Sequence, residues 1–353
     1  MNRFLKLSFI IFSTAVLCAT VTAGNKDRAG QAGGAALLIN PWARSTGWGG
    51  ANTANVTGLE ALSLNVAGTA FTKKTEVIFA HTNWLNVSGS IDSDININSF
   101  GLTQRVGETG VLGLSVMSMN FGDIMLTTVD KPEGGMGNYS PNYSIIALSY
   151  AKEFSNSIYG GLAVKVLSEK TSNVGATGVC VDAGVRYVTG EKDRIKFGIA
   201  LRNVGPPMQF KGDGLSFRTP SPAGNSSLTV NQRTFPYELP SMVNIGGSYD
   251  FWLAEDHTIT VAGNFSSNSF TKDQFLLGLE YGFKKYFMLR GGYMHEKGIR
   301  TVSDRTTPFT GPAAGVTFEL PLNDKGTTFG LDYSYRTTNP FNGVHSIGAR
   351  INL

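Results

Sequence analysis

The segment Gln274–Phe283, with the sequence QFLLGLEYGF, decides the fold class of this chain. Successive side chains of a β-strand point to opposite faces, so alternate positions of the segment share a face. One face carries only large apolar side chains, and the other is mainly polar or glycine. The apolar face consists of Phe275, Leu277, Leu279, Tyr281 and Phe283, and the other includes Gln274, Gly278, Glu280 and Gly282. Such a strand suits the wall of a membrane barrel, with lipid on one side and water on the other.

The same alternation recurs along most of the chain after residue 74 and predicts an all-β fold. It marks about fourteen strands, an even number of the kind expected of a bacterial outer-membrane barrel. They span residues 75–87, 92–104, 109–120, 143–154, 158–168, 176–188, 194–205, 241–251, 256–266, 273–283, 286–296, 312–320, 326–336 and 345–353. The first two strands alternate least regularly. We therefore expect a transmembrane antiparallel β-barrel.

The connections between these strands alternate between short and long. The short ones include 105–108, 155–157, 189–193, 252–255, 284–285 and 321–325, and the long ones include 121–142, 206–240, 297–311 and 337–344. Outer-membrane barrels have short turns on the periplasmic side and long loops outside the cell. The pattern therefore predicts extracellular long loops in the cell outer membrane. With an even number of strands, it also predicts that both chain ends lie on the periplasmic side.

The inward faces of the predicted strands carry several charges. These residues are Asp182, Arg186, Arg202, Arg290, Asp332 and Arg336. A soluble β-sandwich rarely buries so many charges, whereas the lumen of a membrane barrel accepts them. They could line a path for a solute, or form salt bridges between the wall and a plug. We favour the salt bridges, because charges in a lumen need partners or water.

The composition agrees with a barrel. Charged residues make up 16% of the chain, below the roughly 25% usual in soluble domains, and 43 of the 353 residues are glycine. After the N-terminal segment, no apolar run approaches the ~18 residues that a transmembrane helix needs. The composition therefore argues against a helical membrane protein and against an ordinary soluble enzyme.

The first 23 residues have the features of an export signal. Arg3 and Lys6 precede an apolar stretch, which ends at a small-residue cleavage site after Ala23. Without this segment the formal net charge falls from +4 to +2, so we expect no nucleic-acid partner. Lipidation of Cys18 is not expected, because Leu17 is too large for a lipobox. Cys180 then remains alone, and no intramolecular disulfide is possible.

Residues 24–74 do not alternate and are rich in glycine. They could be a disordered tail or a plug folded into the lumen. The large apolar side chains Trp42, Trp48, Leu59, Leu62 and Phe71 favour the plug, since a disordered tail has no need of them. The expected organisation is a signal peptide at 1–23, a plug at 24–74 and a barrel at 75–353.

Several short motifs resemble the PorV/PorQ family, which in turn resembles the FadL-type fatty-acid channels. They are LLINPWAR at 37–44, GWGGA at 47–51, GLEAL at 58–62, NVAG at 65–68, RNVGP at 202–206, LRGGY at 289–293, DYSYR at 332–336 and NPFN at 339–342. The likeness spans the mature chain, although Val66 replaces the proline that FadL-type channels usually have in the fourth motif. The resemblance implies a fourteen-stranded FadL-like barrel with an N-terminal plug.

The resemblance also implies a function in a Bacteroidetes-type bacterium with a type IX secretion system. A PorV-like barrel is a non-enzymatic carrier whose partners are secreted proteins with C-terminal signal domains, the large translocon barrel and surface attachment proteins. Its wall would meet outer-membrane lipid and lipopolysaccharide. The alternative is a FadL-like channel for small hydrophobic solutes. A lipid A deacylase has been linked to the family, but no motif here supports it.

The sequence contains no recognisable catalytic or metal-binding motif. No Gly-x-Ser-x-Gly elbow occurs, and His81, His257, His295 and His345 are far apart, without metal-ligand spacing. We expect no enzymatic activity, no cofactor and no metal site.

The connection 206–240 is the strongest candidate for a partner-binding loop. It carries Met208, Phe210, Leu215, Phe217, Phe235 and Tyr237, and the turn at 339–343 adds Phe341. A freely exposed loop would not keep so many large apolar groups, so they pack against neighbouring loops or bind a protein partner.

Overall fold

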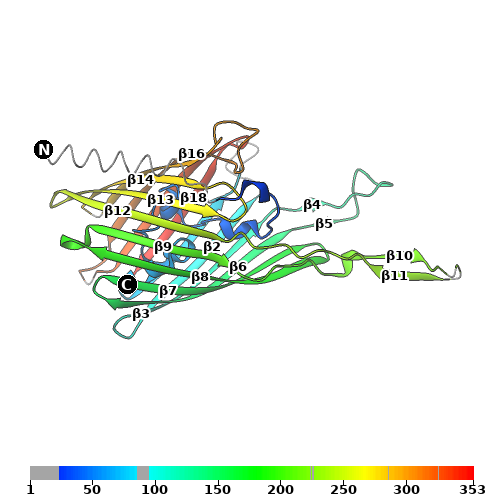
Figure 1. Cartoon of the computed structure of the whole chain (residues 1–353), viewed down its shortest axis with the longest axis horizontal. Helices are drawn as coiled ribbons and strands as arrows, with labels where there is room; N and C mark the ends of the chain where they lie inside the picture. The colour runs from blue at the N-terminus through cyan, green and yellow to red at the C-terminus, as the bar shows by residue number, and fades with distance from the viewer. Residues whose placement is uncertain (1–23, 86–94, 223, 225, 285, 325) are drawn as a thin grey trace.

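The structure is a computed structural model that describes residues 24–85, 95–222, 224, 226–284, 286–324 and 326–353. The predicted signal peptide and residues 86–87 and 92–94 of the first two predicted strands lie outside the described residues. Fourteen strands close into one barrel, in the order β1-β18-β17-β16-β15-β14-β13-β12-β9-β8-β7-β6-β3-β2 (Figure 1). The predicted fourteen-stranded antiparallel barrel is confirmed.

Each predicted strand coincides with one strand of the wall. The wall consists of β1 (Thr75–Asn83), β2 (Asn96–Val106), β3 (Gly110–Asn120), β6 (Asn142–Ser155), β7 (Ile158–Thr171), β8 (Val174–Thr189), β9 (Ile195–Val204), β12 (Met242–Ala254), β13 (His257–Asn268), β14 (Gln274–Phe283), β15 (Phe287–Glu296), β16 (Phe309–Pro321), β17 (Thr328–Thr338) and β18 (Val344–Asn352). The alternation determines which face meets lipid. On β14, Leu277 and Leu279 are 66% and 50% exposed on the outside, whereas Leu276 is buried.

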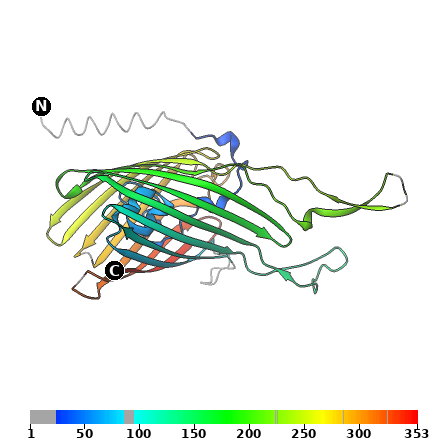
Figure 2. The same cartoon turned by 90° about the horizontal axis from the view of Figure 1, so that it is seen from below.

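The long connections gather at one end of the barrel, the long-loop end, and the short turns at the other, the short-turn end. Two long connections form hairpin arms that extend well beyond the wall (Figures 1 and 2). One contains β4 (Ile124–Met125) and β5 (Asn138–Tyr139), and the other contains β10 (Ser216–Pro220) and β11 (Ser227–Asn231). We call them the first and second arm.

The chain before β1 fills the lumen as a plug of short helices. They are η2 (Ala35–Leu38), α2 (Ala43–Thr46), η3 (Gly58–Ser63) and η4 (Val66–Phe71). The helix η1 (Lys26–Arg28) lies at the long-loop end, and η5 (Glu191–Asp193) and η6 (Asp213–Leu215) lie in connections between strands. Trp42, Leu59 and Leu62 are at most 1% exposed, and Leu59 and Leu62 pack with Ile78 of the wall. No helix in the described parts of the chain has the length and apolar character to cross a membrane.

The prediction that both chain ends lie at the short-turn end is wrong for the described chain. The Asn25 amide donates to Asn268 O (3.4 Å) at the long-loop end of β13, and the Gly33 amide donates to Glu238 O (3.0 Å). Leu353 lies at the opposite end, where its amide donates to Thr75 O (2.9 Å). The even number of strands determines only that β1 begins at the short-turn end. The plug that precedes β1 runs through the lumen and brings Gly24 to the long-loop end.

Candidate functional site

The middle of the plug lies directly on glycines of the barrel wall. A Cβ atom at Gly278 would lie 2.6 Å from Trp48 Cε3, and one at Gly292 would lie 2.2 Å from Trp48 O. These glycines are opposite each other on β14 and β15. A side chain at either position would collide with the plug, so the wall and the plug segment 48–54 are closely fitted.

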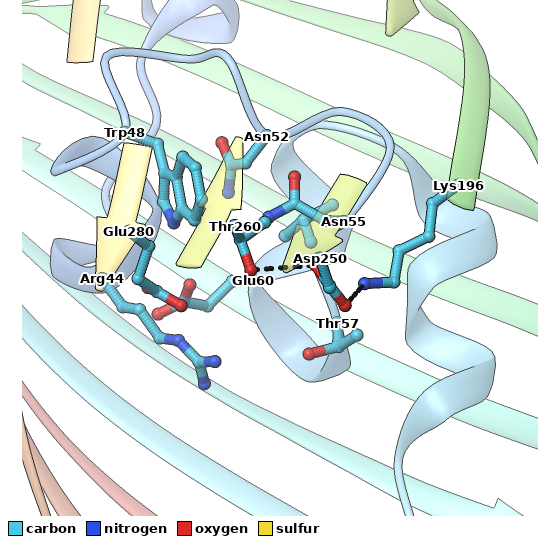
Figure 3. A pocket seen from close by; sticks show the side chains of 11 residues that line it. Arg44, Trp48, Asn52, Asn55, Thr57, Glu60, Lys196, Asp250, Thr260 and Glu280 are labelled. Atoms are coloured by element: carbon cyan, nitrogen blue, oxygen red, sulfur yellow. Dashed lines mark hydrogen bonds and ion pairs between the residues drawn. The ribbon is translucent and has the colours of Figure 1, made fainter. Parts of the chain in front are cut away.

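Two cavities lie against this plug segment, towards opposite ends of the lumen. The first, the short-turn cavity, has a volume of about 200 Å³ and is lined by Arg44, Glu60, Lys196, Asp250 and Glu280, among others (Figure 3). Its wall residues come from the short-turn ends of β9, β12, β13 and β14. The second, the long-loop cavity, has a volume of about 160 Å³ and lies beside the long-loop ends of β12 to β17.

Three of the charged residues that line the short-turn cavity have ion-pair partners: Lys196 and Asp250 pair with each other, and Glu280 pairs with Arg290 of β15. Lys196 forms an ion pair with Asp250, which also accepts a hydrogen bond from Thr260 Oγ1 (2.8 Å; Figure 3). Arg290 Nε donates to Glu280 Oε2 (2.7 Å). These three side chains are therefore already engaged with protein partners, whereas Arg44 and Glu60 form no ion pair within 4.0 Å among the described residues.

The six charged residues predicted for the inward face all point inward, but they do not form the predicted salt bridges with the plug. Of the ion pairs between described residues, none joins residues 35–72 of the plug to the wall. Arg290 pairs with Glu280, and Asp332 lies 3.8 Å from Arg350, both within the wall. The reason is composition: between residues 35 and 72, Arg44 and Glu60 are the only charged residues.

The wall arginines instead reach the plug through its backbone carbonyls. Arg186 Nη1 donates to Val56 O (2.8 Å), and the guanidinium lies 4.0 Å from the centre of the Phe71 ring. Arg202 Nη2 makes a longer contact with Leu37 O (3.4 Å). The remaining predicted residue, Arg336, stacks on Phe309 of the wall. Of the six residues, Arg202 and Arg336 line the long-loop cavity, so these two are the candidates for contact with a solute.

A buried polar cluster ties the wall to the plug and to the second arm; the sequence analysis predicted Asp182 on the inward face but missed its partners Lys165 and Asn203. Lys165 forms an ion pair with Asp182, whose Oδ1 accepts a hydrogen bond from the Asn203 amide (2.8 Å). The Asn203 side chain donates to Leu37 O (3.4 Å) and to Pro240 O (3.2 Å). The signal for Lys165 was its position between the outward residues Val164 and Val166 of β7, which places it on the inward face.

The strand β3 pairs along its whole length with both of its neighbours, β2 and β6, so the wall is continuous there. In the described wall, the pairing register shifts at four places: near Asp182 between β8 and β9, near Gly311 between β16 and β17, and near the short-turn ends of the pairs β6–β7 and β12–β13. These are local bulges and not gaps in the sheet.

The second arm has a packed base and an exposed outer part. Met208, predicted to bind partners, is 1% exposed and pairs through its backbone with Tyr237. The Tyr237 hydroxyl donates to Glu169 (2.8 Å), and its ring lies 5.6 Å from that of Phe210. Burial and the hydrogen bond to Glu169 raise the pKa of Tyr237 above its ordinary value. For these three predicted residues, packing is therefore the role that the structure gives.

The exposed part contains Phe217 and Phe235, two more of the residues predicted to bind partners. Phe217 is 54% exposed and Phe235 is 82% exposed, and Leu228 on β11 adds a third exposed apolar group at 45%. Leu215 and Phe341 are partly buried.

The sequence reasoning overlooked the first arm. Met125, Met136 and Val129 are 50%, 49% and 98% exposed there. The run Ile124-Met125-Leu126 between two strands was the available signal.

In the described chain, no group of His, Cys, Asp and Glu side chains is arranged to hold a metal ion.

No protein-family model and no curated protein sequence matches this chain. Several solved structures match it in fold. The CymD monoaromatic hydrocarbon channel aligns with a TM-score of 0.52 and 12% identity over 89% of this chain and 97% of that chain. The toluene transporter TodX of Pseudomonas putida aligns with a TM-score of 0.54 and 11% identity over the same shares. A FadL homologue of Pseudomonas aeruginosa gives 0.50 and 10% over 88% and 96%.

The chain therefore has the fold of the FadL-type outer-membrane barrels. The low identities establish the fold alone.

Proposed function

We propose that this chain is a non-enzymatic outer-membrane receptor for protein partners, which bind the two arms at the long-loop end. The observation that carries the proposal is the position of the arms: both extend far beyond the wall and expose apolar side chains (Figure 2). Exposed apolar groups on extended hairpins cost solubility and are typical of interaction surfaces. Phe217 and Phe235 are the expected anchors, since aromatic residues commonly dominate the binding energy of an interface.

The second arm also offers a backbone surface to a partner. Its sheet contains only β10 and β11, so each strand has one edge without a neighbouring strand of the described chain. An extended segment of a partner could add to such an edge through main-chain hydrogen bonds, while neighbouring side chains give specificity. We expect a partner that supplies a β-strand.

In this proposal, the expected partners are those that the resemblance to the PorV/PorQ family implies, and the orientation is the one that the alternation of short and long connections implies. They are secreted proteins with C-terminal signal domains, the translocon barrel and surface attachment proteins of a type IX system. In this proposal the long-loop end faces the medium. The tightly fitted plug supports a receptor better than a channel, because binding at the arms requires no open path through the lumen.

The test replaces the exposed groups of the second arm and measures partner recovery. A Phe217→Ser, Leu228→Ser, Phe235→Ser variant should keep its heat-modifiable band on a semi-native gel, because these groups lie outside the wall. Recovery of partner proteins by pull-down from solubilised outer membranes should fall at least tenfold, about 1.4 kcal/mol or more in binding free energy. The matched control carries Phe154→Ser and Leu322→Ser, which remove groups of 68% and 60% exposure at the short-turn end. Equal recovery for both variants would refute the proposal.

A second candidate is a FadL-like channel for small hydrophobic solutes. The comparisons favour it over secretion, because the named structures of this fold include a monoaromatic hydrocarbon channel and a toluene transporter. Within this chain, the apolar part of the long-loop cavity, with Leu276, Met294 and Phe309, is the observation in its favour. Uptake of toluene into proteoliposomes that contain the barrel would support the channel, provided that empty liposomes set the background.

A further inference from the structure

The charged residues that line the long-loop cavity are all positive. The plug contributes residues such as Leu38 and Asn40, and the wall contributes Arg202 of β9 and residues from β12 to β17. Leu38 is 43% exposed, so the cavity lies next to the surface at the long-loop end. Its lining contains two arginines, Arg202 and Arg336, and no aspartate or glutamate.

Arg202 is buried without strong hydrogen bonds. Its side chain is 6% exposed, and its contacts are all long: 3.4 Å to Leu37 O, 3.6 Å to Met242 Sδ and 3.9 Å to Asp182. Its Nε atom has no hydrogen-bond partner. A buried guanidinium usually has closer partners, because an unsatisfied buried donor is costly.

Arg336 stacks on Phe309, with its guanidinium carbon 3.6 Å from the ring centre. Among the described residues, no ion pair within 4.0 Å involves Arg336. Cation–π stacking leaves the edge of a guanidinium free to donate hydrogen bonds. Arg336 can therefore bind an acceptor within the cavity while it stays on the ring.

Two carboxylates contact residues of the lining, and both have partners other than Arg336. Glu296 is fully buried behind the lining, where Gln274 donates to one oxygen and Thr306 donates to the other through its amide and hydroxyl. Asp182 is held by Lys165 and by the Asn203 amide. Neither neutralises Arg336.

The rest of the lining combines polar and apolar groups. Asn40, Asn244, Asn268, Gln274, Ser266, Thr271, Thr306 and Thr307 supply polar groups, and Leu38, Leu276, Met242, Met294 and Phe309 supply apolar surface. Pockets with an apolar wall and a few oriented polar groups are typical of small-molecule sites.

We propose that the long-loop cavity binds a small organic anion. A carboxylate accepts hydrogen bonds from Arg336, Arg202 adds positive potential, and the apolar body of the ligand lies against Leu276, Met294 and Phe309. An arginine and a carboxylate form two parallel hydrogen bonds, which favours this anion over a neutral molecule of the same shape. The inference does not depend on partner binding by the arms, and it specifies a charged ligand where the hydrocarbon reading specifies a neutral one.

Three probes of similar shape and different charge test the inference: benzoate, toluene and benzylammonium. Each is titrated into the purified mature barrel in detergent by isothermal titration calorimetry, with a micelle blank for partitioning. We expect benzoate to bind at least tenfold more tightly than benzylammonium and toluene. Arg336→Gln should weaken benzoate binding at least tenfold, whereas Arg218→Gln, an exposed arginine of the second arm, should not change it.

A second variant keeps the test independent of the arginine. Thr271→Asp places a carboxylate in the cavity from a loop, and it should also abolish benzoate binding, provided that the heat-modifiable band is retained. The inference is overturned if benzoate does not bind, if toluene binds the wild type as well as benzoate does, or if both variants bind benzoate like the wild type. Partner recovery in the arm experiment is a separate measurement, so failure of one proposal is distinguishable from failure of the other.

Discussion

Replacing Gly292 by alanine should loosen the plug, while the same change at the neighbouring Gly291 should not. A Cβ atom at Gly292 would lie 2.2 Å from Trp48 O and 2.3 Å from Trp48 C. At Gly291, the nearest atom would be Ala313 O, at 4.0 Å. The two glycines are adjacent on β15 and neither has a positive φ, so the substitutions differ in what the new methyl group meets.

The structure sets the size of the effect. Ordinary contacts between non-bonded atoms begin near 3.5 Å, so the backbone of Trp48 must retreat by about 1 Å in the Gly292→Ala protein. The colliding atoms belong to the main chain, so no change of rotamer relieves the contact. Overpacking of this kind costs about 1–3 kcal/mol. Gly291→Ala should be neutral or stabilising by up to about 1 kcal/mol, because alanine restricts the unfolded chain.

The assay is urea unfolding of both variants in lipid vesicles, followed by the folded band on semi-native gels. We expect the midpoint of Gly292→Ala to fall relative to wild type, with a deficit of about 1–3 kcal/mol in the free energy of unfolding. Gly291→Ala should match or exceed wild type. Equal stability of the two variants would show that the plug does not rest on Gly292, and the fitted plug described above would be wrong.

Two further stability measurements test the wall and its link to the plug. Leu279→Arg should destabilise the barrel by about 2–4 kcal/mol and lower its assembly yield, because it puts a cation on the lipid face. Leu228→Arg on the second arm, at similar exposure, should leave the assembly yield unchanged, and equal yields for the two variants would mean that the lipid-facing register is wrong. Asn203→Ala should lower the free energy of unfolding by about 2–4 kcal/mol, because it removes buried hydrogen bonds and places alanine at a φ of 60°. Asn203→Gly should recover about 1 kcal/mol of this loss, because glycine adopts a positive φ without strain, and identical unfolding midpoints for the two variants would argue against the left-handed backbone.

The fold was predictable because a barrel wall imposes the same two-residue period on every strand. Leu277, Gly278 and Leu279 show this period directly, and turn lengths fixed the order of the hairpins. Some wall contacts followed from the same information. Glu280 and Arg290 are direct cross-strand neighbours, and the short turn between their strands would have paired them.

Contacts between the plug and the wall were not predictable in this way. The two-residue alternation shows which side chains of a strand point inward, but not which plug residues they meet. Gly278 reads as a small inward residue with room for a side chain, whereas the structure places the Trp48 ring against it. The partner of Arg186 is a plug carbonyl, which carries no mark in the sequence. For the same reason, the position of Gly24 at the long-loop end was not predicted.

The fitted plug separates the two functional candidates on physical grounds. A solute that crossed the barrel by way of the long-loop and short-turn cavities would meet the segment 48–54, which lies against both cavities and on wall glycines that leave no room for an added methyl group. Passage therefore requires the plug to move, which breaks contacts such as that of Arg186 with Val56 O and of Thr46 with Ser334. A partner at Phe217 and Phe235 binds beyond the wall and leaves all of these contacts in place. Receptor function is therefore compatible with the structure as it stands, whereas a channel needs a second conformation whose cost is at least that of unseating the plug.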